Sequence, residues 1–207
     1  MRLQWGAAPI PVAAPEIPGG WRSIVSPASR WAYALAALAG LVLLGSLCSA
    51  LSAWSWFARN QAGMATTGDT ASPWLAASIP ILLFVPLHEA FHLLGQPGWG
   101  STNRSVLVIW PAKLRFGVYF DGCMSRKRWL AMRLAPFVVL SVLPACLVAL
   151  LQARPWTADV EVGLQVMMIV NALGSGADIV AALLVLRQVP PDGLLCFQAG
   201  RAYWRPA

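Results

Sequence analysis

Four long apolar runs dominate this sequence, and they constrain its fold more than any other feature. The first, Trp31–Ala58, lies between Arg30 and Arg59 and contains no charged residue. A transmembrane helix needs about 20 predominantly apolar residues, and a longer run is accommodated by tilting. This run therefore predicts a helix that spans a membrane.

Three further runs repeat the pattern along the chain. They are Pro73–Gly95, Trp129–Ala153 and Val162–Leu186. The composition agrees, since 58% of the residues are hydrophobic and only 11% are charged, against roughly 25% charged residues in soluble domains. So few charges cannot cover a soluble surface, which excludes an ordinary cytosolic enzyme fold, a secreted disulfide scaffold and a disordered tail.

The basic residues predict the orientation of the chain. All but two of the 15 Lys and Arg residues lie in the N-terminal tail, in segment 96–133 or in the C-terminal tail; the exceptions are Arg59 and Arg154. By the positive-inside rule we expect a multi-pass protein of a bacterial-type cytoplasmic membrane with both termini cytoplasmic. The basic cluster Arg126–Arg128 is assigned to the surface of the lipid bilayer, and nucleic acid is not an expected partner.

A β-hairpin is predicted in the cytoplasmic segment between the second and third runs. Ser105–Trp110 and Leu114–Phe120 are rich in β-branched and aromatic residues and flank a turn at Pro111–Lys113. The free edge of such a hairpin offers strand addition to an extended substrate. An amphipathic segment at the membrane interface is the alternative, and the two interpretations are compatible.

The expected fold class is thus an all-α membrane protein with four transmembrane helices and this one hairpin. We expect a four-helix integral membrane domain at 30–190, a Pro/Ala-rich cytoplasmic tail at 1–29 and a cytoplasmic C-terminal tail at 191–207. The four cysteines show no CxxC spacing, and reduced structural thiols are expected. They are Cys48, Cys123, Cys146 and Cys196.

The second run contains an HExxH motif, His88–His92. Residues four apart share one face of a helix, so both imidazoles can bind one metal ion, while Glu89 lies beside them to polarise a water molecule and shuttle its proton. Two histidines and a third protein ligand form the zincin arrangement. A chance motif is the alternative. However, these are the only two histidines of the chain. Ionisable groups inside a membrane are energetically costly, so their presence there indicates a function.

Asp178 in the fourth run is the predicted third zinc ligand. At about 1.5 Å per helical residue, the two histidines lie roughly 22–28 Å along their span and Asp178 about 25 Å along its own, in the same direction. The alternative is a buried ion pair between Asp178 and Arg133. Asp121 is a weaker candidate because it precedes Gly122 and fits a turn.

Asn171 lies two helical turns before Asp178 and therefore on the same helix face. Gly174 and Ser175 between them let a neighbouring helix approach closely. The side-chain amide of Asn171 is a candidate to bind a substrate carbonyl or the developing oxyanion. A hydrogen bond between helices, without a part in catalysis, is an equal alternative.

These motifs together resemble the putative zincin peptidase family of small four-span membrane proteins and, more distantly, the site-two intramembrane metalloproteases. The likeness covers about residues 75–187 and rests on PLHEAFHLL, the hairpin with its aromatic YF pair, RLAPFVVLSVLP and NALGSGADIV. It implies that His88, His92 and Asp178 bind zinc and that Glu89 is the general base. Ala177 departs from the glycine that is usual in the family, without affecting a ligand.

The sequence therefore predicts an intramembrane zinc metallopeptidase with Zn²⁺ as its cofactor. It would hydrolyse a peptide bond of a membrane protein or membrane-associated peptide near the cytoplasmic side. The alternative is a non-catalytic membrane protein whose structural zinc site binds or escorts a partner helix. Metal transport is disfavoured, because the first and third runs carry no interior acid or histidine.

Overall fold

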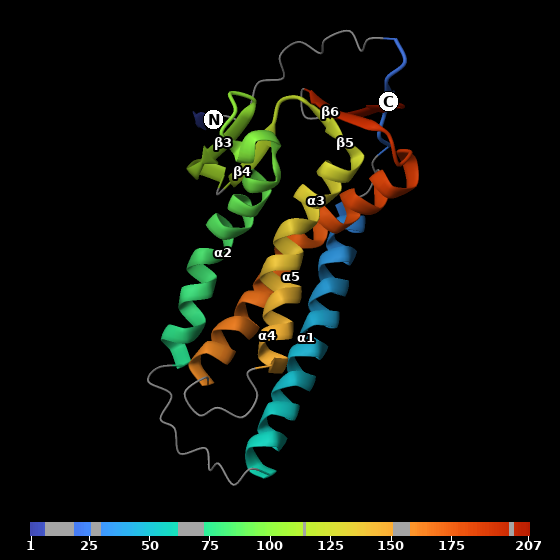
Figure 1. Ribbon diagram of the computed structural model, residues 1–207. Coiled ribbons are helices and arrows are strands. Elements are labelled where there is room, and N and C mark those ends of the chain that lie inside the picture. Colours follow the sequence, from blue (N-terminus) through green and yellow to red (C-terminus); the bar gives the residue numbers. More distant parts are fainter. Residues whose placement is uncertain (7–18, 26–29, 62–72, 114, 151–157, 199–200) are drawn as a thin grey trace. The chain divides into compact units, whose positions relative to one another are not determined.

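The computed structural model describes residues 1–6, 19–25, 30–61, 73–113, 115–150, 158–198 and 201–207 (Figure 1). Arg154 and most of the N-terminal tail therefore lie outside the described residues. The helices are α1 (Arg30–Gln61), α2 (Pro73–Gly95), η1 (Pro97–Gly100), η2 (Pro111–Lys113), α3 (Arg126–Phe137), the π-helical η3 (Val138–Val142), α4 (Leu143–Leu150) and α5 (Ala158–Gln188). The strands are β1 (Arg2–Trp5), β2 (Arg22–Ser23), β3 (Ser105–Trp110), β4 (Arg115–Phe120), β5 (Cys123–Ser125), β6 (Leu194–Gln198) and β7 (Arg201–Arg205).

The chain folds into two compact units. The helical unit comprises Tyr33–His88 and Pro136–Ala177, and the sheet unit comprises Met1–Ala32, Glu89–Ala135 and Asp178–Ala207. The boundaries between them pass through four helices, α1, α2, α3 and α5, and follow Ala32, His88, Ala135 and Ala177. Each of these helices therefore contributes residues to both units.

Small residues bring the helices of the helical unit into contact. A Cβ atom added to Gly176 in α5 would lie 2.8 Å from the Ala37 backbone in α1, and one added to Gly163 would lie 3.3 Å from the carbonyl oxygen of Ala76 in α2. In lipid, helices associate through this kind of close van der Waals packing, because the hydrophobic effect does not drive them together. Helix α5 thus packs directly against both α1 and α2.

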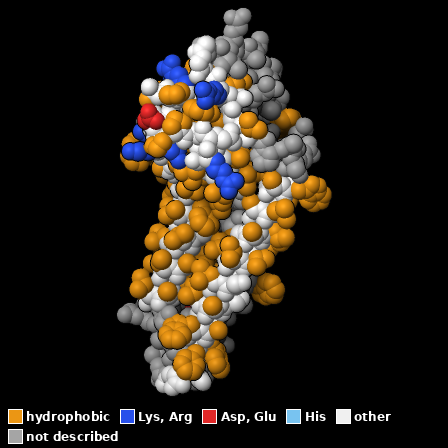
Figure 2. Space-filling model, turned by 90° about the vertical axis from the view of Figure 1, so that its right-hand side faces the viewer, with side chains coloured by type: hydrophobic (Ala, Val, Ile, Leu, Met, Phe, Trp, Pro, Cys, Tyr) orange, Lys and Arg blue, Asp and Glu red, His pale blue; other side chains and the backbone are white. Residues whose placement is uncertain are grey.

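Four helical segments among the described residues are long and apolar enough to cross a membrane. They are Trp31–Trp54, Trp74–Gly95, Arg126–Leu150 and Asp159–Gln188. Large apolar side chains lie on their outer surface, such as Leu43 (70% exposed) and Leu82 (74% exposed), and Figure 2 shows hydrophobic side chains covering the helices in that view. Apolar surface of this extent is unusual in water. Together with the four long apolar helices, it suggests a multi-pass membrane protein.

Two sheets form in the sheet unit, where one hairpin was expected. The predicted strands β3 and β4 pair antiparallel, and β1 adds to β3 in parallel, which gives the order β1-β3-β4. The second sheet is antiparallel with the order β2-β7-β6-β5. The additional strands are two to five residues long, too short to produce a readable alternation of apolar and polar residues.

A hydrophobic core holds the second sheet against the helices of the sheet unit. The buried members of this core come from β4, β5, α3, the end of α5, the residue that follows α5, and β6; they are Phe120, Met124, Trp129, Met132, Val185, Val189 and Leu195. Trp129 of α3 also stacks on Phe197 of β6, with ring centroids 5.8 Å apart. The core therefore sets the position of α3 beside the last turns of α5.

Cys123 in β5 and Cys196 in β6 form a disulfide. The expectation of reduced thiols was wrong for this pair, because pairing depends on the strand register, which places the two cysteines directly opposite each other. Their spacing in the sequence gives no sign of this. Cys48 and Cys146 are free.

Candidate metal centre

The HExxH motif lies in the last two turns of α2. Because α2 is continuous from Pro73 to Gly95, His88 and His92 lie one turn apart on the same face of the helix. Both imidazoles are buried, with exposed fractions of 6% and 5%. Buried imidazoles need hydrogen-bond partners or a metal ion.

His92 is oriented by a backbone carbonyl of α3. Its Nδ1 lies 3.0 Å from the carbonyl oxygen of Met132 and its Nε2 lies 2.9 Å from Oδ2 of Asp178. A carbonyl oxygen only accepts hydrogen bonds, so Nδ1 carries a proton, and the lone pair that a neutral ring has at Nε2 would face the carboxylate oxygen. Two acceptors that face each other require a proton or a metal cation between them.

Gly95 makes this arrangement possible. A Cβ atom at Gly95 would lie only 2.7 Å from Cα of Met132, which is closer than real Cβ contacts. The end of α2 therefore approaches the backbone of α3 closely enough for the Met132 carbonyl to reach His92. Arg128 of α3 reinforces the contact, since its side chain donates to the carbonyl oxygens of Gly95 and Gln96 at the end of α2.

The two oxygens of Asp178 have different neighbours. Oδ1 accepts a hydrogen bond of 2.6 Å from Nη1 of Arg133, while Oδ2 faces His92. The ion pair with Arg133, considered above as an alternative to metal binding, is therefore formed. It occupies one oxygen and leaves the other directed at the histidine, so an ion pair and a ligand role are compatible.

His88 is oriented by a side chain. Its Nδ1 lies 2.9 Å from Oδ1 of Asn171, and Nδ2 of Asn171 donates to Oγ of Ser141 at 2.7 Å and to the carbonyl oxygen of Pro136 at 3.2 Å. The carbonyl partner identifies Nδ2 as the amide nitrogen, so Oδ1 accepts the proton of His88 Nδ1. Nδ1 of His88 is thus committed to Asn171.

These contacts describe Asn171 as a residue that positions His88. Its side chain is fully buried, and both amide hydrogens have acceptors within the helical unit. The interhelical alternative accounts for the observed contacts of Asn171 without a role for an oxyanion.

The donor atoms of the three predicted ligands gather in one place. One ligand atom from each of His88, His92 and Asp178 lies within 4.8 Å of the other two. Two imidazole nitrogens and one carboxylate oxygen form a donor set of the catalytic zinc type. In addition, both imidazoles have Nδ1 committed to an outer acceptor, as metal-binding histidines almost always do. The residues present therefore fit a zinc ion.

Glu89 lies at the outer edge of β4. Its Oε2 accepts a hydrogen bond of 2.8 Å from the backbone N–H of Val118. The N–H of Asp121 donates to the carbonyl oxygen of Arg104. In this antiparallel register, every second residue of β4 directs its backbone N–H and C=O groups toward β3. Val118 belongs to the other set, so its backbone groups point away from β3. The Glu89 carboxylate thus contacts the edge of β4 that faces away from β3.

A family model described as Putative zincin peptidase matches residues 81–194. This chain belongs to that family. The match confirms the resemblance drawn from the sequence, and it includes the HExxH motif, Asn171 and Asp178. No match is found among curated proteins or among solved structures.

Within this member of the putative zincin peptidase family, the weaker candidate Asp121 has a different neighbour. Its carboxylate forms an exposed ion pair with Arg2, 2.9 Å long, of the kind that adds little stability. It does not belong to the group formed by the two histidines and Asp178.

Sequence reasoning missed Met132, Ser141 and Gly95. The carbonyl of Met132 has no sequence signature, whereas Gly95 directly after the HExxH helix turn was a signal of close packing.

Proposed function

We propose that this protein is an intramembrane zinc metallopeptidase that cleaves a membrane-associated protein or peptide near the cytoplasmic side. The observation that carries the proposal is the buried convergence of His88, His92 and Asp178, with Glu89 on the same helix turn. Membership of the putative zincin peptidase family supports the same reaction class.

The residues of the chain have distinct roles in this reaction. A bound zinc ion supplies Lewis-acid activation of water and of the peptide carbonyl. His88, His92 and Asp178 would hold the ion, and Arg133 keeps the carboxylate oriented through Oδ1. Glu89 takes a proton from the attacking water and returns it to the leaving amine.

The free edge of β4 is the proposed place for the substrate backbone. Among the described residues, β4 is the last strand of its sheet, and the register directs the backbone groups of Phe116, Val118 and Phe120 outward. An extended peptide that adds to this edge lies beside Glu89. A substrate carbonyl that accepts the Val118 N–H would also release Glu89 from its present hydrogen bond for proton transfer.

The Glu89→Gln variant tests the reaction. The amide keeps an oxygen for the Val118 N–H, so the fold and zinc content should be retained, while removal of the base should lower cleavage by about 10²–10⁴-fold. The measurement is cleavage of a panel of labelled transmembrane peptides by protein reconstituted in liposomes, together with metal analysis.

Asp121→Asn is the matched control, because it neutralises an exposed acid outside the centre and should cleave like the wild type. A fully active Glu89→Gln variant would contradict the peptidase mechanism. If Glu89→Gln instead left partner binding intact while His88→Ala abolished it, the structural zinc site would be the correct alternative.

A further inference from the structure

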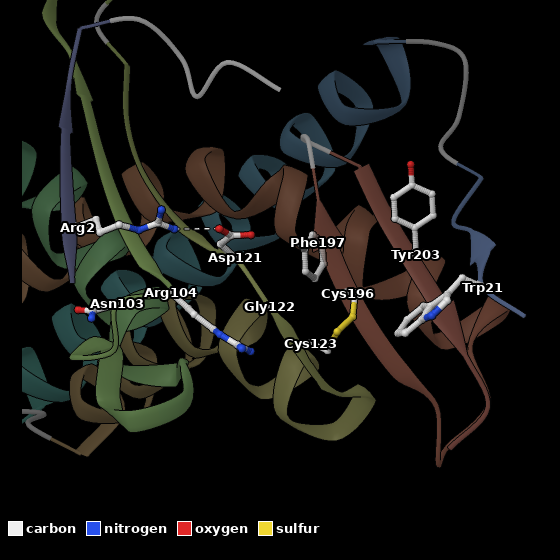
Figure 3. Close-up of a pocket in the computed structure, with 10 residues that line it drawn as sticks. All are labelled: Arg2, Trp21, Asn103, Arg104, Asp121, Gly122, Cys123, Cys196, Phe197 and Tyr203. Carbon is white, nitrogen blue, oxygen red and sulfur yellow. Dashed lines mark hydrogen bonds and ion pairs between the residues drawn. A yellow bond between two sulfur atoms is a disulfide. The ribbon is translucent and has the colours of Figure 1, made fainter. Parts of the chain in front are cut away.

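A cavity of about 530 Å³ in the sheet unit opens onto the Cys123–Cys196 disulfide. Figure 3 shows the disulfide among the lining residues, with Phe197 on the same strand as Cys196 and the Arg2–Asp121 ion pair beside the cavity. Cys123 is exposed and Cys196 is half-buried. We therefore expect a small thiol reagent to reach the disulfide through this cavity without unfolding of the unit.

The disulfide connects the two helices that shape the metal centre in the sheet unit. Cys123 lies in β5, which leads directly into α3, and Cys196 lies in β6, which closely follows α5. Two hydrogen bonds accompany this connection. The backbone N–H of Arg126 donates to the carbonyl oxygen of Gly193, and Nη2 of Arg126 donates to that of Leu186. The first turn of α3 is thus tied to the end of α5.

The same two helices supply the groups that orient His92 and Asp178. Helix α3 provides the Met132 carbonyl for His92 and the guanidinium of Arg133 for Asp178, while α5 carries Asp178 itself. A change in the separation of α3 and α5 therefore alters the hydrogen bond between Arg133 and Asp178, and a movement of α3 itself also alters the one between Met132 and His92.

A cationic side chain, Arg104, lines the same cavity as the disulfide. The ideal Cβ position of Gly122 is 3.2 Å from Cδ of Arg104, so the arginine side chain packs against the residue that precedes Cys123. Neighbouring cations favour the thiolate form of cysteine, and a stabilised leaving thiolate speeds thiol–disulfide exchange. An accessible disulfide with such a neighbour has the features of a reducible bond.

We propose that Cys123–Cys196 is a redox-active disulfide whose reduction by a dithiol weakens metal binding at the centre. A thiolate of the reductant attacks one cysteine sulfur, forms a mixed disulfide and releases the other cysteine as a thiolate. The second thiol of the reductant then displaces the remaining cysteine. Two electrons pass to the protein, both cysteines end as thiols, and the reductant leaves as a disulfide. The effect on metal affinity rests on the proposed zinc centre.

The first experiment measures the opening of the disulfide independently of zinc. The purified full chain in lipid nanodiscs is treated with dithiothreitol under native conditions, labelled with N-ethylmaleimide and weighed by mass spectrometry. We expect reduction to add two labels to the wild type. It should add no label to the Cys123→Ser/Cys196→Ser variant. A pair that stays oxidised until the protein is denatured would overturn the proposal.

The second experiment measures zinc affinity by competition with a chromophoric chelator, after the reductant has been removed under nitrogen. Reduction should lower the affinity about tenfold, the lower range for loss of an outer hydrogen-bond partner. The double serine variant should show the lower affinity in both buffers. Cys146→Ser is the matched control, since this thiol is exposed and free, and should respond like the wild type.

The two measurements separate the two proposals. Equal zinc affinity in the oxidised and reduced protein would overturn redox control while leaving the metal centre intact. Absence of zinc binding in the oxidised wild type would contradict the metal centre and, with it, the proposed coupling.

Discussion

The two imidazoles of α2 lie one turn apart but are oriented by different kinds of partner. His88 donates to the side chain of Asn171, whereas His92 donates to the backbone carbonyl of Met132. A side-chain partner is specified by one residue and can be deleted by one substitution. A backbone partner is specified by the distance between two helices, so only a change in packing removes it. The same ring orientation thus depends on residue identity in one case and on helix packing in the other.

The largest effect should come from removing either imidazole. If both histidines are ligands, His88→Ala and His92→Ala should each lower zinc affinity by more than the roughly 10–100-fold that an outer partner is worth. Metal analysis and chelator competition on the purified variants check this. Loss of zinc in only one of them would break the comparison, because the other histidine would then be a structural residue.

The second-largest effect should come from Gly95→Ala, which tests whether the packing of α2 against α3 orients His92. The added methyl group would collide with the backbone of Met132, so α3 must move away from α2. We expect a loss of stability of about 1–3 kcal/mol and a decrease in zinc affinity of about 10–100-fold, because the partner of His92 moves with α3.

Gly45→Ala is the matched control for this substitution. It lies in α1 with nothing within 4 Å of the added Cβ, so it should gain up to about 1 kcal/mol from helix propensity and leave zinc affinity unchanged. Thermal unfolding and zinc competition measure both quantities. A Gly95→Ala protein with wild-type affinity would show that the Met132 carbonyl does not orient His92.

The smallest effect should come from Asn171→Ala, which deletes the side-chain partner of His88. We expect zinc affinity to fall about tenfold, and Ser141→Ala, which removes only a partner of Asn171, should cost less. Chelator competition on both variants gives the ratio. An Asn171→Ala loss as large as that of His88→Ala would mean that Asn171 does more than hold the imidazole.

The helices and the convergence of His88, His92 and Asp178 could be predicted because each leaves a strong signal in the sequence. Long uncharged runs have few alternatives to spanning helices. The HExxH spacing places both histidines on one face of a helix. Asp178 could be matched to them because the rise per helical residue gives the depth of each residue along its span, and the two predicted depths agree. The ion pair of Asp178 with Arg133, predicted as the alternative to metal binding, is present in the structure.

The contacts that tune these ligands were less accessible from the sequence. The hydrogen bond from Val118 to Glu89 depends on which backbone groups of β4 face β3, and a one-residue change of register reverses that choice. The role of the Met132 carbonyl depends on helix packing, and its residue type does not affect it. The cysteine pair and the short strands of both tails likewise arise from long-range pairing, which local patterns do not encode.

The pairing of β2 with β7 has a consequence for the order of folding. Ser23 lies opposite Tyr203, and β7 follows every other described element along the chain. Such a contact closes only after Tyr203 has been synthesised, and contacts of such high sequence separation form slowly. The second sheet, which anchors α3 beside α5, is therefore a late product of folding. A nascent or truncated chain that lacks β7 would have its helices in place before the geometry of the centre is complete.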